Sequence, residues 1–535
     1  MPSYGVAERN GRLFEHYVCA AAYDPDVIGY DLAHIKDIGM NAISIFVYNE
    51  SIRECNNILD LITRAEELGI VTDLSIRRHV YPMDYVEDEV EELIKKLHFD
   101  ENDSIVAYDI AWEPRIGHYI EKKNYIGRKG WDADWAAWVV EQYGSLEHAE
   151  QLWGSPINHD EQGNIIGVTD EMLDDTSDTY TKIVSAYRRF VDDIVSKIFN
   201  EKLRHLRALA PNQLVSLRMS MSGSAMTTPR FTPSGFCYDF SSFASTLDFM
   251  EPEGYSLTGS ETAALQIIFS NAYNRYIQPG TPVVWKEYGK HVWNGSNFSS
   301  GENGSPNDLL YAQEEYYKTT LKYCLRGHTA GMFAWFYAGG FRPGENSDYG
   351  ILNPDGSDRP ATKLLREYAP KFLSLDKCPA PDIILTVERD DSNRGIFAMY
   401  DQTKDALRKA FDEGKSVAFI NKKQTAVCDT VYADTTLDEA VGGTAAEGKY
   451  PLRYVNGMIK NVEPCCDGTK ITVCNTLPTV WKAGTVSIMA GDDVVAVIDE
   501  EVSYLTNVSV NTSVAPDTLL RLSIGGKAFG MSYQA

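Results

Sequence analysis

The first third of the chain repeats one short pattern, which restricts the fold more than any other feature of the sequence. Apolar residues at helical spacing lead to Gly39 and are followed by an apolar run at 42–47, and the same order recurs at 58–68, Gly69 and 70–76. A glycine directly after a helix permits the left-handed conformation that ends it. Short apolar runs after such helices are typical of buried parallel strands, so the repeats favour an α/β fold.

This pattern continues over about 376 residues and predicts a (β/α)8 TIM barrel there. Eight apolar runs predict strands, near 14–21, 41–48, 70–76, 104–112, 213–219, 247–255, 282–287 and 330–337. Helical segments separate most of them, at 31–38, 57–68, 87–97, 179–209, 261–276 and 308–325. The rival architecture is a doubly wound sheet, which would be favoured by a glycine-rich phosphate turn after the first strand. The chain instead reads Ala22-Tyr23-Asp24-Pro25 at that point.

A long insertion, 114–178, interrupts the barrel after its fourth predicted strand. Trp131, Trp135 and Trp138 are four and three residues apart, so they share one face of a helix. We expect this face to pack on the barrel. The alternative is a lid or wall beside a ligand pocket, because long loops at this end of a barrel often contribute to ligand sites.

Two further segments follow the barrel, which is predicted to span residues 1–376. Residues 383–420 read as strand, helix and strand, which predicts a small α/β segment at 377–440. Residues 441–535 are rich in Val, Thr, Ser and Gly with alternating apolar positions, a pattern that predicts an antiparallel β-sandwich. For this last domain, packing or oligomerisation is favoured over glycan binding.

The charge balance excludes several classes of partner. The net charge is −26, from 50 basic and 76 acidic residues, whereas phosphate-binding surfaces need clustered Lys and Arg. We therefore expect no nucleic acid and no membrane as partner. No apolar run of membrane-spanning length occurs, and the first twelve residues do not resemble a signal peptide. A cytoplasmic location is expected, or secretion if a signal peptide has been removed.

Two glutamates carry the strongest chemical signal. Glu113 follows the fourth predicted strand and precedes a proline, and Glu287 ends the seventh strand, two residues before Gly289. Active sites of TIM barrels lie at the carboxyl ends of the strands, where these two side chains would face each other. Retaining glycosidases need two carboxyl groups about 5 Å apart, one as general acid/base and one as nucleophile. Glu253 is a third strand-end carboxylate whose participation stays open.

These segments resemble the clan A retaining (β/α)8 glycoside hydrolases. The matching motifs are Glu113-Pro114, Glu287-Tyr288-Gly289, Trp335 at the end of strand 8, Asp348-Tyr349-Gly350-Ile351-Leu352 and Arg359-Pro360-Ala361. Tyr143-Gly144-Ser145 and Trp153-Gly154 resemble a segment of families 42 and 35. The resemblance implies Glu113 as acid/base, Glu287 as nucleophile and, through family 42, a possible trimer or dimer. One residue departs from the clan: Trp112 stands where an Asn usually holds the sugar 2-hydroxyl.

Other polar and aromatic residues at predicted strand ends are candidate substrate contacts. Arg77 could orient the nucleophile, Tyr255 occupies the place of a clan tyrosine that donates to it, and Trp335 could form the floor of a sugar subsite. Packing or salt bridges at the barrel mouth would explain each of them equally well. The full set of candidates is Arg77, Trp112, Tyr255, Trp335, Tyr48, Asn49, Arg218 and Trp285.

The sequence thus predicts a retaining glycoside hydrolase that cleaves a β-linked glycoside by double displacement, with a carbohydrate substrate and no metal or cofactor. A β-galactosidase is the first choice, and a β-mannosidase, a β-glucosidase or an endo-acting β-glycanase is the alternative. From another class, a catalytically inactive glycan-binding barrel would fit the same fold. A metal-dependent isomerase is disfavoured because the ten His are scattered, and only His79 and His118 lie close behind predicted strand ends.

Overall fold

The computed structural model describes most of the 535-residue chain. The described residues are 8–9, 12–13, 18, 23–47, 52–76, 87–112, 128–175, 177, 179–218, 247–255, 260–277, 281–293, 304–341, 347–375, 380–387, 396–421, 458–465, 468–475, 480–504, 506–515, 518, 520–524 and 527–533.

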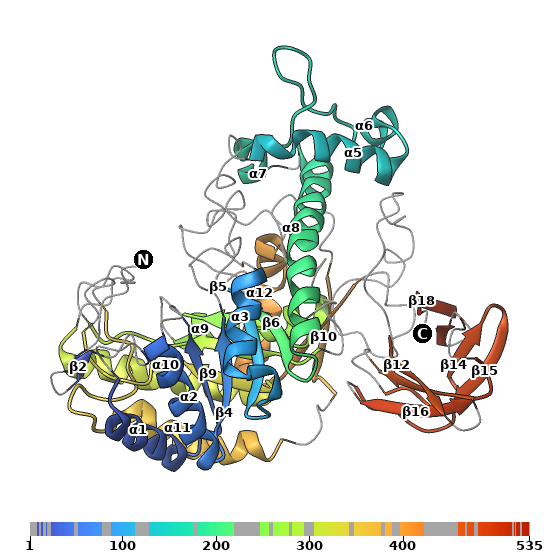
Figure 1. The fold of residues 1–535 in the computed structure, drawn as a ribbon. Coiled ribbons are helices and arrows are strands. Elements are labelled where there is room, and N and C mark those ends of the chain that lie inside the picture. Colours follow the sequence, from blue (N-terminus) through green and yellow to red (C-terminus); the bar gives the residue numbers. More distant parts are fainter. Residues whose placement is uncertain are drawn as a thin grey trace.

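Parallel strands form the centre of the larger part of the molecule (Figure 1). One sheet has the order β3 (Ala42–Phe46), β4 (Val71–Ser75), β5 (Ile105–Trp112) and β6 (Leu214–Arg218), and a second has the order β7 (Glu253–Gly254), β8 (Val284–Tyr288) and β9 (Gly331–Ala334). Parallel bridges from Arg218 to Glu251 and from Met250 to Val283 join the two sheets into one series. These strands match seven of the eight predicted runs; the first, 14–21, lies almost entirely outside the described residues.

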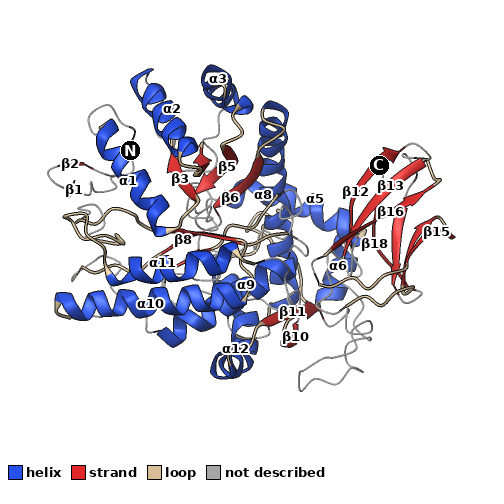
Figure 2. Ribbon diagram, turned by 90° about the horizontal axis from the view of Figure 1, so that it is seen from below, coloured by secondary structure: helices blue, strands red, loops and turns tan. Residues whose placement is uncertain are grey.

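Helices connect the strands and surround them (Figure 2). They are α1 (Pro25–Ile38), α2 (Ile52–Glu67), α3 (Glu87–Leu97), α8 (Thr181–Leu209), α9 (Ser260–Ile277), α10 (Pro306–Arg326) and α11 (Pro360–Leu373). Helix α1 begins where the Asp24 side chain accepts hydrogen bonds from the N–H groups of Asp26 and Val27, and it ends at Gly39, whose φ is +93°. The glycine therefore ends this helix in the way the sequence predicts. No helix in the described ranges combines the length and the apolar character needed to cross a bilayer.

Aromatic side chains of the insertion pack together and belong to the same hydrophobic core as the barrel. The helices of the insertion are α5 (Asp132–Tyr143), α6 (Leu146–Trp153) and α7 (Asp170–Asp174), which lie at the end of α8 that projects beyond the strands (Figure 1). Trp135 is fully buried and stacks on Trp138 and Trp153, with ring centroids 5.6 and 5.8 Å apart, and it also contacts Phe190 of α8. The tryptophan face thus packs on a barrel helix, but on the half of that helix that is remote from the strands.

The segment after the barrel packs against the helical layer. Strand β10 (Ile383–Val387) pairs in parallel with β11 (Val417–Asn421), and α12 (Ile396–Glu413) connects them, as the strand–helix–strand pattern predicts. The Phe419 ring lies 5.4 Å from the Phe269 ring of α9. This segment therefore shares a hydrophobic core with the barrel helices.

The C-terminal region consists of two antiparallel sheets (Figure 2). Their strands are β12 (Met458–Cys465), β13 (Gly468–Cys474), β14 (Val486–Ala490), β15 (Asp493–Ile498), β16 (Asn507–Thr512), β17 (Leu520–Ile524) and β18 (Lys527–Tyr533). One sheet has the order β12-β13-β16 and the other β15-β14-β17-β18. Ile471 and Val473 of the first sheet and Val486, Ile488 and Leu522 of the second belong to one apolar core, which is separate from the barrel core. A short hairpin, β1 (Glu8–Arg9) and β2 (Arg12–Leu13), lies near the N-terminus.

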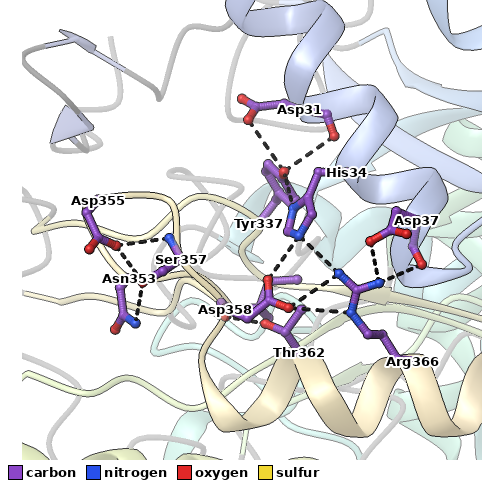
Figure 3. Close-up of polar contacts among 11 residues, drawn as sticks. Asp31, His34, Asp37, Tyr337, Asn353, Asp355, Ser357, Asp358, Thr362 and Arg366 are labelled. Atoms are coloured by element: carbon purple, nitrogen blue, oxygen red, sulfur yellow. Dashed lines mark hydrogen bonds and ion pairs between the residues drawn. The ribbon is translucent and has the colours of Figure 1, made fainter.

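A polar network ties the end of β9 to two outer helices (Figure 3). The His34 ring of α1 lies between Tyr337 and Asp358, with Nδ1 3.0 Å from the Tyr337 hydroxyl and Nε2 2.9 Å from an Asp358 carboxylate oxygen. Arg366 of α11 contacts both Asp358 and Asp37. The network therefore connects helices α1 and α11 to each other and to the chain that follows β9.

Candidate active site

Glu287 lies at the end of β8, and its carboxylate is almost completely buried, with 3% of the residue exposed. Arg218 donates from Nη1 to Oε1 of this carboxylate. The Tyr255 hydroxyl donates to Oε2 over 2.5 Å. Each oxygen of the candidate nucleophile is therefore held by a donor from the end of another strand.

A bulge explains why Glu287 reaches this position. Side chains alternate between the two faces of a strand, and the indole of Trp285 turns outward to donate to Asn271 of α9. Lys286 turns inward to Asp73, so regular alternation would send Glu287 outward again. The pairing of β8 with β9 shifts register between Trp285 and Tyr288, and such a bulge re-aims side chains.

Arg218 occupies the centre of the site. Its Nη2 donates to an Asp109 carboxylate oxygen over 3.0 Å and to the Ser44 hydroxyl over 3.1 Å, and its guanidinium lies over the Phe46 ring, 4.4 Å from the centroid. Burial alone would lower the pKa of this guanidinium, but the carboxylates of Asp109 and Glu287 outweigh burial and raise the pKa. Arg218 therefore stays charged and gives Glu287 a permanent positive neighbour.

Tyr255 is held as a hydrogen-bond donor. Burial, with the adjacent Glu287 charge, raises the pKa of its hydroxyl well above the usual value, so the hydroxyl keeps its proton. The Tyr349 ring packs edge-on against Tyr255, with centroids 5.6 Å apart, and His291 packs on Tyr349 in the same manner at 5.5 Å. The Tyr349 backbone segment is anchored by Arg359, which binds both carboxylate oxygens of Asp348.

Trp335 lies close to this cluster. Its ring contacts the Phe46 ring edge-on at 6.1 Å, and Phe46 in turn supports Arg218. The backbone N–H of Trp335 donates to the carbonyl of Tyr288, which joins the ends of β9 and β8. A side chain at Gly289 would meet the Trp335 carbonyl oxygen at 2.1 Å, so glycine is required where the chain leaves β8.

The remaining predicted contacts divide into three groups. Trp285 is fully buried between β8 and α9 and is not part of the cluster around Glu287. Trp112 ends β5, where its backbone pairs with Arg218 of β6. Four predicted site residues lie outside the described residues: Glu113, Arg77, Tyr48 and Asn49. Glu253, the third strand-end carboxylate, is fully buried and pairs in register with Glu287.

Sequence reasoning missed a set of charged residues inside the barrel. Lys286 donates to Asp73 and, over 3.0 Å, to Glu251, and it lies 3.5 Å from Asp109. A signal was present: Asp73 and Ser75 alternate with apolar residues in β4, so both face the interior. Because these runs are mostly apolar, their pattern predicts wholly apolar strands and does not identify the polar residues that face the interior.

Comparison with known proteins found one family match. Residues 62–300 match a family model described as beta-galactosidase, a stretch that includes Glu113, Arg218 and Glu287. No curated protein matches the chain in sequence.

Solved structures show the fold. A β-galactosidase from the Antarctic haloarchaeon Halorubrum lacusprofundi has a TM-score of 0.55 at 12% identity, over 78% of this chain and 66% of that one, just under two thirds of its length. The β-galactosidase of the psychrophilic Marinomonas ef1 has a TM-score of 0.52 at 13% identity, over 75% and 68%. Gan42B, a GH42 β-galactosidase from G. stearothermophilus, has a TM-score of 0.52 at 11% identity, over 94% and 82%.

The solved structures thus show a (β/α)8 barrel fold, here with a C-terminal antiparallel sheet region, and the family match shows similarity to the β-galactosidase model over residues 62–300.

Proposed function

We propose that this protein is a retaining β-glycosidase, with Glu287 as nucleophile and Glu113 as general acid/base. The substrate class that we favour is the β-galactosides. The observation that carries the proposal is the buried Glu287 carboxylate, held by Arg218 and Tyr255 at the carboxyl end of a barrel strand. A carboxylate in such a place requires compensating partners, and here those partners also orient it.

The reaction would proceed in two displacements. In the first, Glu287 attacks the anomeric carbon, the bond to the leaving oxygen breaks, and Glu113 transfers its proton to that oxygen. In the second, Glu113 takes a proton from water, the water oxygen attacks the anomeric carbon, and the bond to Glu287 breaks. The Tyr255 hydroxyl and Arg218 would hold the carboxylate before attack and receive it again after hydrolysis.

The position of Glu113 in the chain supports its role. It directly follows Trp112, the last residue of β5, whose backbone pairs with Arg218, the residue that holds Glu287. The register of β5 against β6 shifts between Asp109 and Trp112, so each strand that leads to a proposed catalytic glutamate carries an irregularity near its end. Bulges are frequent beside active sites at barrel rims.

β-Galactosides are the first choice of substrate because the matching family and the three solved structures are β-galactosidases. β-Mannosides, β-glucosides and internal β-glycan bonds are the alternatives, since Trp112 replaces the Asn that usually contacts the 2-hydroxyl. For the chain as a whole we propose a catalytic barrel at 1–376, a supporting segment at 377–440 and a C-terminal domain at 441–535, in a trimer or dimer.

A glycan-binding barrel without activity is the second candidate. Binding alone gives no reason to retain a buried, charge-paired carboxylate at the strand end, because well-packed apolar residues would stabilise the barrel at least equally well. Turnover therefore separates the two candidates.

The test is hydrolysis of a panel of nitrophenyl α- and β-glycosides by the wild type, Glu287→Ala and Glu113→Ala. One β-glycoside should be cleaved with retention at the anomeric carbon, observed by proton NMR. Azide should rescue both variants, giving the β-glycosyl azide with Glu113→Ala and the α-glycosyl azide with Glu287→Ala. Inversion, or the absence of cleavage with nitrophenyl glycosides and with β-linked oligosaccharides, would contradict the proposal.

A further inference from the structure

A ladder of alternating charges runs through the barrel interior to the candidate nucleophile. It consists of Asp73, Lys286, Asp109, Arg218 and Glu287, which are each at most 3% exposed. The Lys286 ammonium contacts Asp73 and lies 3.5 Å from Oδ2 of Asp109. The same Asp109 oxygen accepts from Arg218 over 3.0 Å, and Arg218 donates to Glu287.

Neutral and acidic neighbours fix the members of this ladder. The Ser75 hydroxyl donates to Oδ1 of Asp109 over 2.5 Å, so both oxygens of that carboxylate are engaged. The Ser44 hydroxyl bridges Asp73, at 3.3 Å, and Arg218, at 3.1 Å. Glu251 binds Lys286 from the far side, and burial raises the pKa of its carboxyl to about 8.

Stability alone does not account for the ladder. Barrel interiors are usually filled by Val, Ile and Leu, and replacing a buried ion pair with apolar residues is often neutral or stabilising. A charge between two opposite charges, however, has a sharply defined position, because each displacement lengthens at least one contact in a medium of low dielectric. The ladder therefore supplies geometry, and its last member is Glu287.

Lys286 has a second effect because it precedes Glu287 in the bulge. Its ammonium is anchored by Asp73 on β4 and Glu251 beside β7. Since Lys286 points into the barrel, the register shift directly after it directs Glu287 toward Arg218 and Tyr255. Anchoring the lysine thus fixes the backbone that carries the nucleophile.

We propose that Lys286 and Asp109 are positioning residues for glycoside cleavage, which hold Arg218 and the β8 bulge so that the Glu287 carboxylate faces the anomeric carbon. The inference rests on the proposed role of Glu287. Neither residue touches the substrate; both act through Arg218 and the backbone of β8.

The test is a double-mutant cycle on Lys286→Met and Asp73→Asn, with kcat, KM and Tm measured for each protein. Lys286→Met should lower kcat about 100-fold with KM changed by less than about threefold, since misplacement by about 1 Å has effects of this size. It should also lower Tm, because it leaves Asp73 and Asp109 less neutralised. The double variant should recover part of the Tm, since Asp73 is then uncharged, but kcat should stay low.

Arg128→Met is the matched control. Arg128 is fully buried and ion-paired over 2.5 Å with Asp170 of α7, at the end of α8 that projects beyond the strands (Figure 1). This variant should lose Tm while kcat stays within about twofold of the wild type. If the double variant recovers kcat together with Tm, or if Lys286→Met keeps its kcat, the positioning role is wrong.

Crystal structures of the wild type and Lys286→Met give a readout that needs no turnover. The contact between Arg218 Nη1 and Glu287 Oε1 should be lost or displaced in the variant. An unchanged Glu287 position would overturn the inference even if the enzyme is active. Conversely, a wild type that cleaves no glycoside refutes the proposed function, while a displaced carboxylate would still support the positioning of Glu287 by Lys286.

Discussion

The interior of the barrel and the core between the C-terminal sheets are filled by opposite kinds of side chain. Between the two C-terminal sheets, the core is built from apolar side chains such as Ile471, Val486 and Ile488, each with no exposed surface. Inside the barrel, at the level of Asp73 and Lys286, the strands bring acids and cations together instead. Both sets of side chains are buried, so the difference lies in what each interior must specify.

An apolar core tolerates substitutions of similar volume, because burial of apolar area has no direction. An ionic interior stabilises less per residue, but it defines the direction of each side chain. The C-terminal region therefore has the composition of a structural unit, whereas the barrel interior has that of a support for one carboxylate. The following predictions test this division, from the largest expected effect to the smallest.

Arg218→Met should have the largest effect. The variant leaves Asp109 and Glu287 buried without the cation between them, which should cost about 3–5 kcal/mol of stability. It should also lower kcat about 1,000-fold, because one donor to the nucleophile is lost and the carboxylate can turn. Urea unfolding and steady-state kinetics measure the two effects. A kcat within tenfold of the wild type would show that Arg218 only balances charge.

Tyr255→Phe should lower kcat by about 10- to 100-fold, since it removes a single donor to Glu287. Stability should change by only about 1 kcal/mol, because the ring keeps its packing against Tyr349. Kinetics at constant pH, with Tyr349→Phe as a control that keeps the ring contact, give the comparison. An equal loss in both variants would argue against a specific role for the Tyr255 hydroxyl.

Ile488→Ala in β14 should lower stability but leave catalysis almost unchanged, in contrast to the barrel variants. Removing a buried branched side chain should destabilise the C-terminal unit by about 2–4 kcal/mol. The kcat and KM for a nitrophenyl glycoside should stay within about twofold of the wild type, because the residue belongs to a separate core. Calorimetry and kinetics at 25 °C measure both. A large fall in kcat would show that this unit contributes to the site.

Glu251→Gln tests the ionic interior through the pH dependence of stability. Burial raises the pKa of Glu251 from about 4.5 to about 8, so between these values the folded protein holds a proton that the unfolded chain releases. Stability from this group is therefore present at low pH and declines as pH rises toward 8, by up to about 1.4 kcal/mol per pH unit. Urea midpoints from pH 5 to 8 should decline less steeply in the variant. If the urea midpoints of the wild type and the variant decline equally steeply with pH, the pH dependence comes from another group.

Local patterns in the sequence predicted much of the fold. Gly39 ends α1 with a positive φ, and the runs at 42–47 and 70–76 became neighbouring parallel strands. Arg218 and Tyr255 were candidate substrate contacts because they end predicted strands, and both contact Glu287. Helix termini, strand periodicity and strand-end position can be read from the sequence because they are properties of short segments.

The same reasoning was less successful where long-range contacts decide. Trp285 was a candidate substrate contact, but the structure turns its indole toward α9, because the register shift begins only after it. The tryptophans of the insertion were expected to pack on the barrel, and they pack on its helix α8, but the sequence did not show that they would lie on its projecting half. In both cases the partner lies on another element, and periodicity cannot specify it.

The sequence by itself determined the alternation of strands and helices, the two strand-end glutamates and the change to antiparallel strands near the C-terminus, because each depends on the order of residues along the chain. Only the tertiary structure decided that Asp73, Asp109, Lys286 and Arg218, which come from four different strands, form one ladder of charges beneath Glu287. The reason is physical: a buried charge is tolerable only when its counter-charge is within contact distance, and that distance is set by the register of neighbouring strands.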